Sequence, residues 1–105
     1  MLESKFKKDF LRELEDIFPG CIILHNDATL KPGIPDTVIF WNENWAMLEF
    51  KKSVLASVRP NQEYYVGLLD AMSFAAFVYP ENRNEVLDAL QASFRAGRQA
   101  RISQP

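Results

Sequence analysis

The chain has 105 residues, 48% of them apolar, so it can form one domain with a single core, and its length argues against two domains. The formal charge of -2 argues against a uniformly basic nucleic-acid-binding surface, although local basic clusters are compatible with it. A single cysteine, Cys21, excludes a disulfide framework, and no apolar stretch approaches the roughly 18 residues that span a bilayer. The composition indicates a soluble intracellular protein in a reducing cytosol.

The first part of the chain predicts a helix, a strand and a loop. In residues 1–18, apolar side chains recur at steps of three and four, which predicts an amphipathic helix that stops at Pro19-Gly20. Residues 21–25 are apolar and rich in β-branched side chains, which predicts a short strand. The turn formers of residues 26–35 then predict a loop.

The middle of the chain predicts a β-hairpin followed by a helix and a strand. Residues 36–41 and 45–51 are both strand-like, and the Asn-Glu-Asn between them suits a tight reversal. From Pro60 the apolar period changes to that of a helix, and Gln62 lies on its apolar stripe. The nearly continuous apolar run 73–79 is typical of a strand covered on both faces, so we expect it at the centre of the sheet.

A last helix completes the predicted order. Asn82 followed by Glu85 resembles a capping box at its start. The order of helix, three strands, helix, strand and helix predicts a mixed α/β fold in which helices cover a small sheet. We expect one domain over residues 1–97, followed by a polar, basic tail over residues 98–105.

The hairpin brings two carboxylates together. If the reversal has two residues, Asp36 faces Glu49 across the ladder; if it has three, Asp36 faces Phe50. In either register the carboxylates of Asp36 and Glu49 are neighbours. Because side chains alternate along a strand, Lys51 projects from the same face as Glu49. Three ionisable groups therefore converge at one end of the predicted hairpin.

This set of groups suits phosphodiester hydrolysis. Two adjacent carboxylates repel each other unless a cation lies between them, and oxygen ligands suit Mg²⁺ or Mn²⁺ rather than zinc. Lys51 beside such a metal could position or help deprotonate a water, or stabilise charge on a phosphate.

The same residues resemble the motif of the PD-(D/E)XK nuclease superfamily, here Pro35-Asp36 followed by Glu49-Phe50-Lys51. The resemblance covers nearly the whole chain. Its segments "GIPD", "LEFK", "RPNQEYY" and "MSFAAFVYPEN" are similar to small nucleases that are common in bacteriophages and related to the VRR and Holliday-junction-resolvase branches. It implies a restriction-endonuclease-like core and, for a phage-encoded chain, the host cytoplasm.

The resemblance also implies roles for site residues. Asp36 and Glu49 would bind Mg²⁺ or Mn²⁺ with help from the Phe50 carbonyl, and Lys51 would act on the water. Gln62 resembles a glutamine that several branches place close to this lysine. A polar residue on an apolar stripe needs a partner, although a contact in the first turn of the helix is the alternative.

Related families place a further glutamate ligand on the first helix, and Glu3 is the best match. The alternative is that Ser4 caps the helix and leaves Glu3 outside it; Glu13 and Glu15 are the competing glutamates. His25, the only histidine, is read as a structural residue, with a substrate contact as the alternative, and a zinc site is not expected.

The expected partner is DNA, with recognition of DNA shape or strand junctions rather than of sequence, because no helix is rich in major-groove readers. Lys31, Lys52 and Arg59 are the expected nucleic-acid contacts. Further clusters that could contact phosphates are Lys5, Lys7 and Lys8; Lys51 and Lys52; and Arg95, Arg98 and Arg101. A homodimer would present two active sites. The alternatives are an RNA nuclease and an accessory module that keeps the fold but does not cleave.

Overall fold

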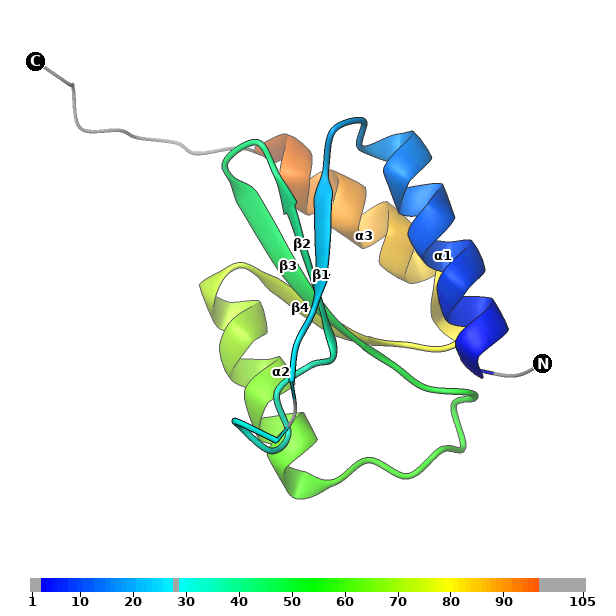
Figure 1. The fold of residues 1–105 in the computed structure, drawn as a ribbon, viewed down its shortest axis with the longest axis vertical. Coiled ribbons are helices and arrows are strands. Elements are labelled where there is room, and N and C mark those ends of the chain that lie inside the picture. The colour runs from blue at the N-terminus through cyan, green and yellow to red at the C-terminus, as the bar shows by residue number, and fades with distance from the viewer. Residues whose placement is uncertain (1–2, 28, 97–105) are drawn as a thin grey trace, which may run out of the picture.

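The computed structural model describes residues 3–27 and 29–96, with side chains from residue 5 onward (Figure 1). Its elements are α1 (Glu3–Ile17), β1 (Ile22–His25), β2 (Thr37–Trp41), β3 (Asn44–Phe50), α2 (Pro60–Met72), β4 (Phe74–Val78), the 3₁₀ helix η1 (Pro80–Asn82) and α3 (Arg83–Ala96). This confirms the predicted order and fold class. The expected tail, residues 98–105, lies outside the described residues. No helix in the described part is long and apolar enough to cross a membrane.

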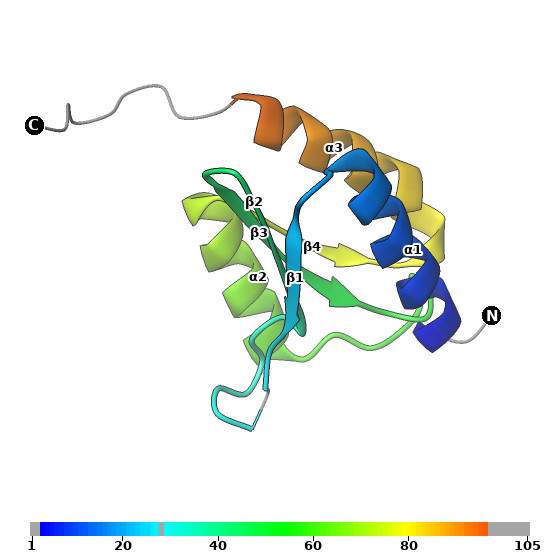
Figure 2. The same cartoon turned by 45° about the horizontal axis from the view of Figure 1, so that its top comes forward.

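The four strands form one mixed sheet in the order β1-β2-β3-β4. The pairs β1–β2 and β2–β3 are antiparallel, and β3–β4 is parallel. The expectation that residues 73–79 form a central strand is therefore wrong, because β4 lies at an edge. Helices α2 and α3 contact β4 from opposite faces, as Figures 1 and 2 show, and this double cover accounts for its continuous apolar sequence.

The hairpin has the shorter of the two predicted turns. Trp41 pairs with Asn44, so the reversal consists of two residues, and the register continues to Thr37 opposite Leu48. Asn42 has a φ of 55°, a left-handed conformation that asparagine adopts more readily than most residues. Because the turn sets the register of the whole ladder, it also decides which residues meet at the far end of the strands.

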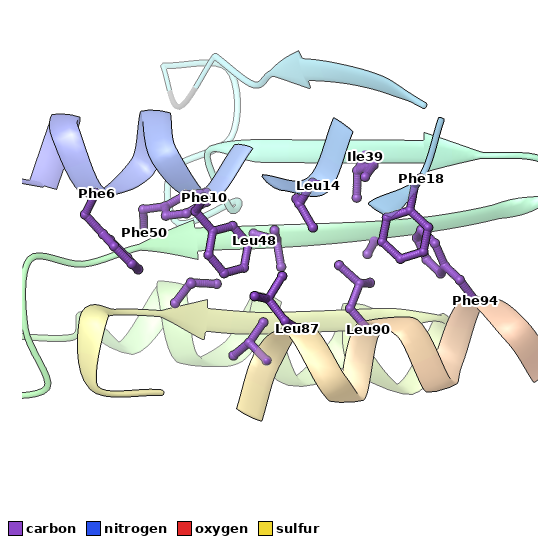
Figure 3. Close-up of a cluster of buried hydrophobic side chains, with 13 residues drawn as sticks. Phe6, Phe10, Leu14, Phe18, Ile39, Leu48, Phe50, Leu87, Leu90 and Phe94 are labelled. Carbon is purple, nitrogen blue, oxygen red and sulfur yellow. The ribbon is translucent and has the colours of Figure 1, made fainter. Parts of the chain in front are cut away.

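The main core lies between the sheet and helices α1 and α3 (Figure 3). Helix α1 supplies buried side chains at steps of four: Phe6, Phe10, Leu14 and Phe18, the last just beyond its end. The sheet and α3 supply Ile39, Ala46, Leu48, Phe50, Val78, Val86, Leu87, Leu90 and Phe94. On β3 the even-numbered residues take this side, so the odd-numbered ones face α2.

A smaller core lies on the α2 face, where Val66, Leu69 and Ala75 are buried together. Helix α2 starts at Pro60, as predicted, and the Arg59 N–H before it donates to Gln62 Oε1 at 3.0 Å. This bond satisfies a backbone donor that has no partner within the helix. It also holds the Gln62 side chain at the start of the helix, beside the end of β3.

The start of α3 differs from the prediction. Asn82 was expected to cap the helix together with Glu85, but Asn82 lies in η1 and its side chain turns back. Its Oδ1 accepts the Tyr79 N–H at 3.0 Å, and its Nδ2 donates to the Phe77 carbonyl at 2.9 Å. Asn82 therefore fixes the exit of β4 rather than the first turn of α3.

Candidate active site

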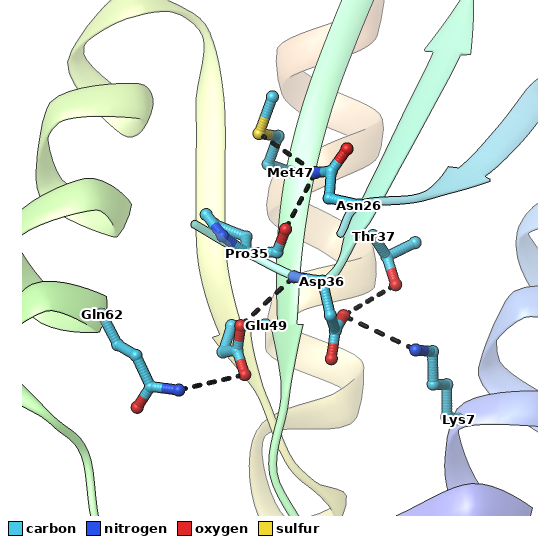
Figure 4. Close-up of polar contacts among 8 residues, drawn as sticks. All are labelled: Lys7, Asn26, Pro35, Asp36, Thr37, Met47, Glu49 and Gln62. Carbon is cyan, nitrogen blue, oxygen red and sulfur yellow. Dashed lines mark hydrogen bonds and ion pairs between the residues drawn. The ribbon is translucent and has the colours of Figure 1, made fainter. Parts of the chain in front are cut away.

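The two predicted carboxylates meet where β2 and β3 end (Figure 4). One step beyond the Thr37–Leu48 pair, the register places Asp36 opposite Glu49. The Asp36 N–H donates to Glu49 Oε1 at 3.2 Å. Glu49 is buried, with 8% of its surface exposed, whereas the Asp36 side chain is 31% exposed. One carboxylate thus belongs to the protein interior and the other opens to solvent.

Gln62 connects Glu49 to the site lysine. Lys51 Nζ donates to Gln62 Oε1 at 2.9 Å, and Gln62 Nε2 donates to Glu49 Oε2 over a longer 3.4 Å. Because Gln62 Oε1 also accepts the Arg59 N–H, the orientation of the amide is set by donors on one side and a carboxylate on the other. Gln62 therefore holds the lysine ammonium and the glutamate in fixed relative positions.

Pro35 affects the end of the ladder. The Asn26 N–H donates to the Asp36 carbonyl at 2.8 Å, so this carbonyl points toward the residue that follows β1. The paired register of β2 and β3 ends at Thr37 and Leu48. Pro35, two residues before Thr37, has no backbone N–H and cannot extend the ladder as a donor.

Asn26 has a structural role that its sequence context does not indicate. Its side-chain Nδ2 donates to the Pro35 carbonyl at 2.8 Å while its backbone binds Asp36, so it holds both residues of the dipeptide. In the sequence Asn26 was only the first turn former of a loop. Nearby, the Thr29 hydroxyl and N–H donate to the Asp27 carboxylate and lower its pKa, which favours the ionised form in this loop.

Helix α1 contributes Lys7, which in the sequence is only one member of the basic cluster Lys5, Lys7 and Lys8. Lys7 Nζ lies 3.6 Å from Asp36 Oδ1, and the Thr37 hydroxyl donates to the same oxygen at 2.7 Å. In Figure 4, Lys7 and Gln62 approach the two carboxylates from opposite sides, because α1 and α2 cover opposite faces of the sheet. The site therefore lies between the two helical layers.

A pocket of about 480 Å³ opens in front of the carboxylates. It is lined by Pro32, Gly33, Ile34, Asp36, Glu49, Arg59, Pro60, Asn61 and Gln62. Gly33 has a φ of 92°, and a Cβ there would come within 2.5 Å of the Asn61 Cβ. Glycine therefore allows the loop after β1 to lie against the start of α2, and this contact forms one wall of the pocket.

The chemistry of these donors fits a hard divalent cation only in part. Two carboxylates and a backbone carbonyl are oxygen ligands of the kind that Mg²⁺ and Mn²⁺ prefer. Within residues 5–27 and 29–96, however, no group of three or more His, Cys, Asp or Glu side chains is gathered for a metal. Among the described side chains, a metal here would therefore be bound by the carboxylates of Asp36 and Glu49, and its other ligands would be groups such as the backbone carbonyl.

The expected third glutamate is only partly resolved. Helix α1 includes both Glu3 and Ser4, so the alternative that leaves Glu3 outside the helix is wrong, while the Glu3 side chain lies outside the described part. Glu13 pairs with Arg83, between α1 and α3. Burial of the Cys21 thiol, together with the charge of nearby Glu15, raises the pKa of this thiol, so Glu15 lies at the opposite end of α1 from Glu3. Neither competitor is thereby placed at the site.

The three residues expected to contact DNA differ in how close they lie to the pocket. Arg59 lines it directly. Lys31, next to the lining residue Pro32, has its ammonium 5.5 Å from the centroid of the Tyr65 ring on α2. Lys52 is exposed in the loop after β3. Of the other clusters, Lys5 pairs with Asp9 and Arg95 donates to Gln91, while Arg98 and Arg101 lie outside the described residues.

His25 ends β1, and its side chain is exposed. Tyr64 is 62% exposed on α2, whereas Tyr65 packs against the smaller core.

The helix-covered mixed sheet has the fold of VRR_NUC-type domains. A solved structure described as a "VRR_NUC domain protein" aligns with a TM-score of 0.67, over 99% of this chain and 97% of the other. The two sequences are 17% identical, so the likeness concerns the fold. No protein-family model matches the sequence, and no curated protein matches it.

Proposed function

We propose that this chain is a metal-dependent nuclease of the PD-(D/E)XK class that hydrolyses DNA phosphodiester bonds. The observation that carries the proposal is the pairing of Asp36 and Glu49, with Lys51 held beside Glu49 through Gln62. A fold shared with a VRR_NUC domain protein supports the same class. If Lys51 and Glu49 served only as a structural ion pair, a second carboxylate, that of Asp36, would not be needed beside them at the pocket.

Asp36, Glu49 and the Phe50 carbonyl would hold a Mg²⁺ or Mn²⁺ ion, with Glu3 as a further ligand from α1. When bound, the ion supplies charge neutralisation at the phosphate and activation of water at neutral pH. The Thr37 hydroxyl orients the Asp36 carboxylate through its 2.7 Å hydrogen bond. The buried position of Glu49 excludes bulk water from one side of the site.

Lys51 is the proposed catalytic cation. Its ammonium donates to Gln62 and has further donors that can orient a water or a phosphate oxygen. Gln62 acts as a positioning residue, because its contacts are to Lys51, Glu49 and the backbone of Arg59. The pocket in front of the site admits the phosphate, and Arg59 at its edge can contact the next one.

DNA with strand junctions or branches is the proposed substrate, since the small fold has no helix suited to reading a base sequence. A single divalent cation cancels the chain's formal charge of -2, so DNA binding should depend on metal as well as on salt. The second candidate is an accessory module that binds nucleic acid without cleaving it. The absence of a third carboxylate among the described side chains is the observation that keeps this candidate in the test.

The test is cleavage of end-labelled single-stranded, duplex, forked and four-way-junction DNA, and of matched RNA, in Mg²⁺ or Mn²⁺. The variants are Asp36→Asn and Glu49→Gln, with Asp88→Asn and Glu63→Gln as controls, because these two acidic residues are exposed on α3 and α2. We expect the wild type and both controls to cleave, and the two site variants to lose at least about 100-fold in rate.

Cleavage that survives in Asp36→Asn would contradict the proposed site. No cleavage of any substrate by the wild type, with DNA binding retained, would favour the accessory module. Preference for RNA would change the substrate class while leaving the site assignment intact.

A further inference from the structure

Lys7 is the lysine of the α1 cluster that turns toward the candidate site. Its side chain is 22% exposed, whereas that of Lys5 is 68% exposed and paired with Asp9. Lys8, the next residue, is exposed on the helix. Three lysines that look equivalent in the sequence therefore differ in the fold, and of the three only Lys7 forms an ion pair with a candidate metal ligand.

Two contacts hold the Lys7 ammonium in place. It lies 3.6 Å from Asp36 Oδ1, a distance of ion pairing that is too long for a hydrogen bond, and 5.4 Å from the centroid of the Phe50 ring. The Phe50 ring is 1% exposed and meets the rings of Phe6 and Phe10 edge-on. The aromatic side of the contact is thus fixed by the core, and only the lysine can move.

We propose that Lys7 is a substrate-binding residue that exchanges one anion for another: it neutralises Asp36 while no metal is bound, and it contacts a substrate phosphate when a divalent cation is held by Asp36 and Glu49. This inference rests on the proposed function and assigns a role that the motif of the hairpin does not contain. Lys7 enters from a different helix and from the opposite face of the sheet to Gln62 (Figure 4).

The charges of the site explain why the exchange is needed. Asp36, Glu49, Lys51 and Lys7 carry two negative and two positive formal charges, so these four groups balance one another without a metal. A divalent cation near Asp36 repels the lysine ammonium, and the two cations therefore compete for one carboxylate. The Thr37 hydroxyl and the Lys7 ammonium both contact Asp36 Oδ1, and the Asp36 side chain is 31% exposed, so a metal can approach through Oδ2 before Lys7 leaves.

The lysine side chain suits a moving contact. Its ammonium is a compact charge on a flexible four-carbon stem, and its partial exposure gives it room to leave Asp36 without disturbing the core. The nearest strong anion in a loaded complex is the phosphate in front of the carboxylates. Removing Lys7 should therefore have opposite effects on two ligands: metal binds more tightly to the free protein, and DNA binds less tightly to the metal-loaded protein.

The test titrates Mn²⁺ into the full chain, with free Mn²⁺ followed by electron paramagnetic resonance, for wild type, Lys7→Met, Lys7→Arg and Lys8→Met. We expect Lys7→Met to bind Mn²⁺ about two- to five-fold more tightly, as for removal of a partly exposed ion pair. Lys8→Met makes the same change of net charge on the same helix and should bind as the wild type does. Lys7→Arg keeps the charge and should also stay close to the wild type.

Steady-state cleavage supplies the second readout. The KM for DNA should rise about five-fold in Lys7→Met with a smaller change in kcat, and Lys7→Arg should restore most of the loss. Circular dichroism checks folding, and Lys7→Gln provides a second neutral side chain if Lys7→Met fails to fold.

The outcomes separate this inference from the proposed function. Equal Mn²⁺ affinity in wild type and Lys7→Met would overturn the role of Lys7 and leave the nuclease proposal standing. No Mn²⁺ binding by the wild type, by Lys7→Met or by Lys7→Gln would overturn the metal site itself, and the role of Lys7 with it.

Discussion

The two faces of the sheet differ in what they bury. On the α1 and α3 face, aromatic and aliphatic side chains form a continuous core that includes Phe10 and Phe50. On the α2 face only Val66, Leu69 and Ala75 are buried as an apolar cluster, and the buried carboxylate of Glu49 takes part of the remaining space. The first face supplies most of the stability, and the weaker second face can therefore contain polar groups that a single large core would exclude.

Phe10→Ala tests how much the core on the α1 and α3 face contributes to stability. The Phe10 ring is fully buried and packs against Phe6 and Phe50, so its removal leaves a cavity. We expect a loss of about 3–5 kcal/mol in the free energy of unfolding, measured by urea denaturation. Leu69→Ala on the α2 face is the matched comparison and should cost about 2 kcal/mol. Equal losses would contradict the unequal contribution of the two faces.

Gly33→Ala tests the wall between the loop and α2. The new Cβ would meet the backbone of Asn61 within 2.8 Å, at a residue that already has a left-handed φ. We expect a loss of about 2–4 kcal/mol and a disturbed pocket, from the combined cost of backbone strain and overpacking. Gly20→Ala is the control, since Gly20 has a φ of 85° but no atom within 4 Å of an added Cβ.

The control should lose about 1–2 kcal/mol, the cost of the left-handed backbone alone. If both glycine variants lose the same amount in thermal unfolding, the close approach to Asn61 carries no cost and the loop is free to shift.

Gln62→Ala should separate activity from stability on the α2 face. The variant loses the bridge between Lys51 and Glu49, and we expect the cleavage rate to fall about 10- to 100-fold, as for other residues that orient site groups. The free energy of unfolding should change by only about 1 kcal/mol, because the side chain is partly exposed. A rate loss that merely follows unfolding would remove Gln62 from the site.

Lys31→Met gives the smallest expected effect. The contact of Lys31 with Tyr65 is worth about 0.5–1 kcal/mol at an exposed position. We expect DNA affinity at low salt to fall by about two- to five-fold, measured by filter binding or fluorescence. The slope of log affinity against log salt concentration should decrease in magnitude by about 1, the value for one lost phosphate contact. An unchanged salt slope would exclude Lys31 from the DNA interface. Arg12→Met, at an exposed position on α1, is the control for charge alone.

The meeting of the two carboxylates could be predicted because it depends on local rules. Alternation along β3 and a short hairpin bring Asp36 and Glu49 together in either predicted register, so the uncertain turn did not matter. The start of α2 at Pro60 was predictable for the same reason, since a proline at this position costs no helix hydrogen bond.

What was missed depends on the tertiary fold. Lys7 and Asp36 are far apart in the sequence and meet only because α1 packs across the end of the sheet. The edge position of β4 was mispredicted because apolar runs report how strongly helices cover a strand, and not how many strands pair with it. The role of Asn26 could not be predicted, because an asparagine in a loop sequence looks the same whether or not it binds a distant segment. Its two hydrogen bonds to Pro35 and Asp36 form only in the fold.

The most direct test of the central claim is the anomalous difference map of crystals grown with Mn²⁺. The proposal predicts a peak between the carboxylates of Asp36 and Glu49, with the Phe50 carbonyl among the ligands, and no peak at this position in Asp36→Asn. A map with no peak between Asp36 and Glu49 in the wild type, at Mn²⁺ concentrations that support cleavage, would contradict the proposed metal centre.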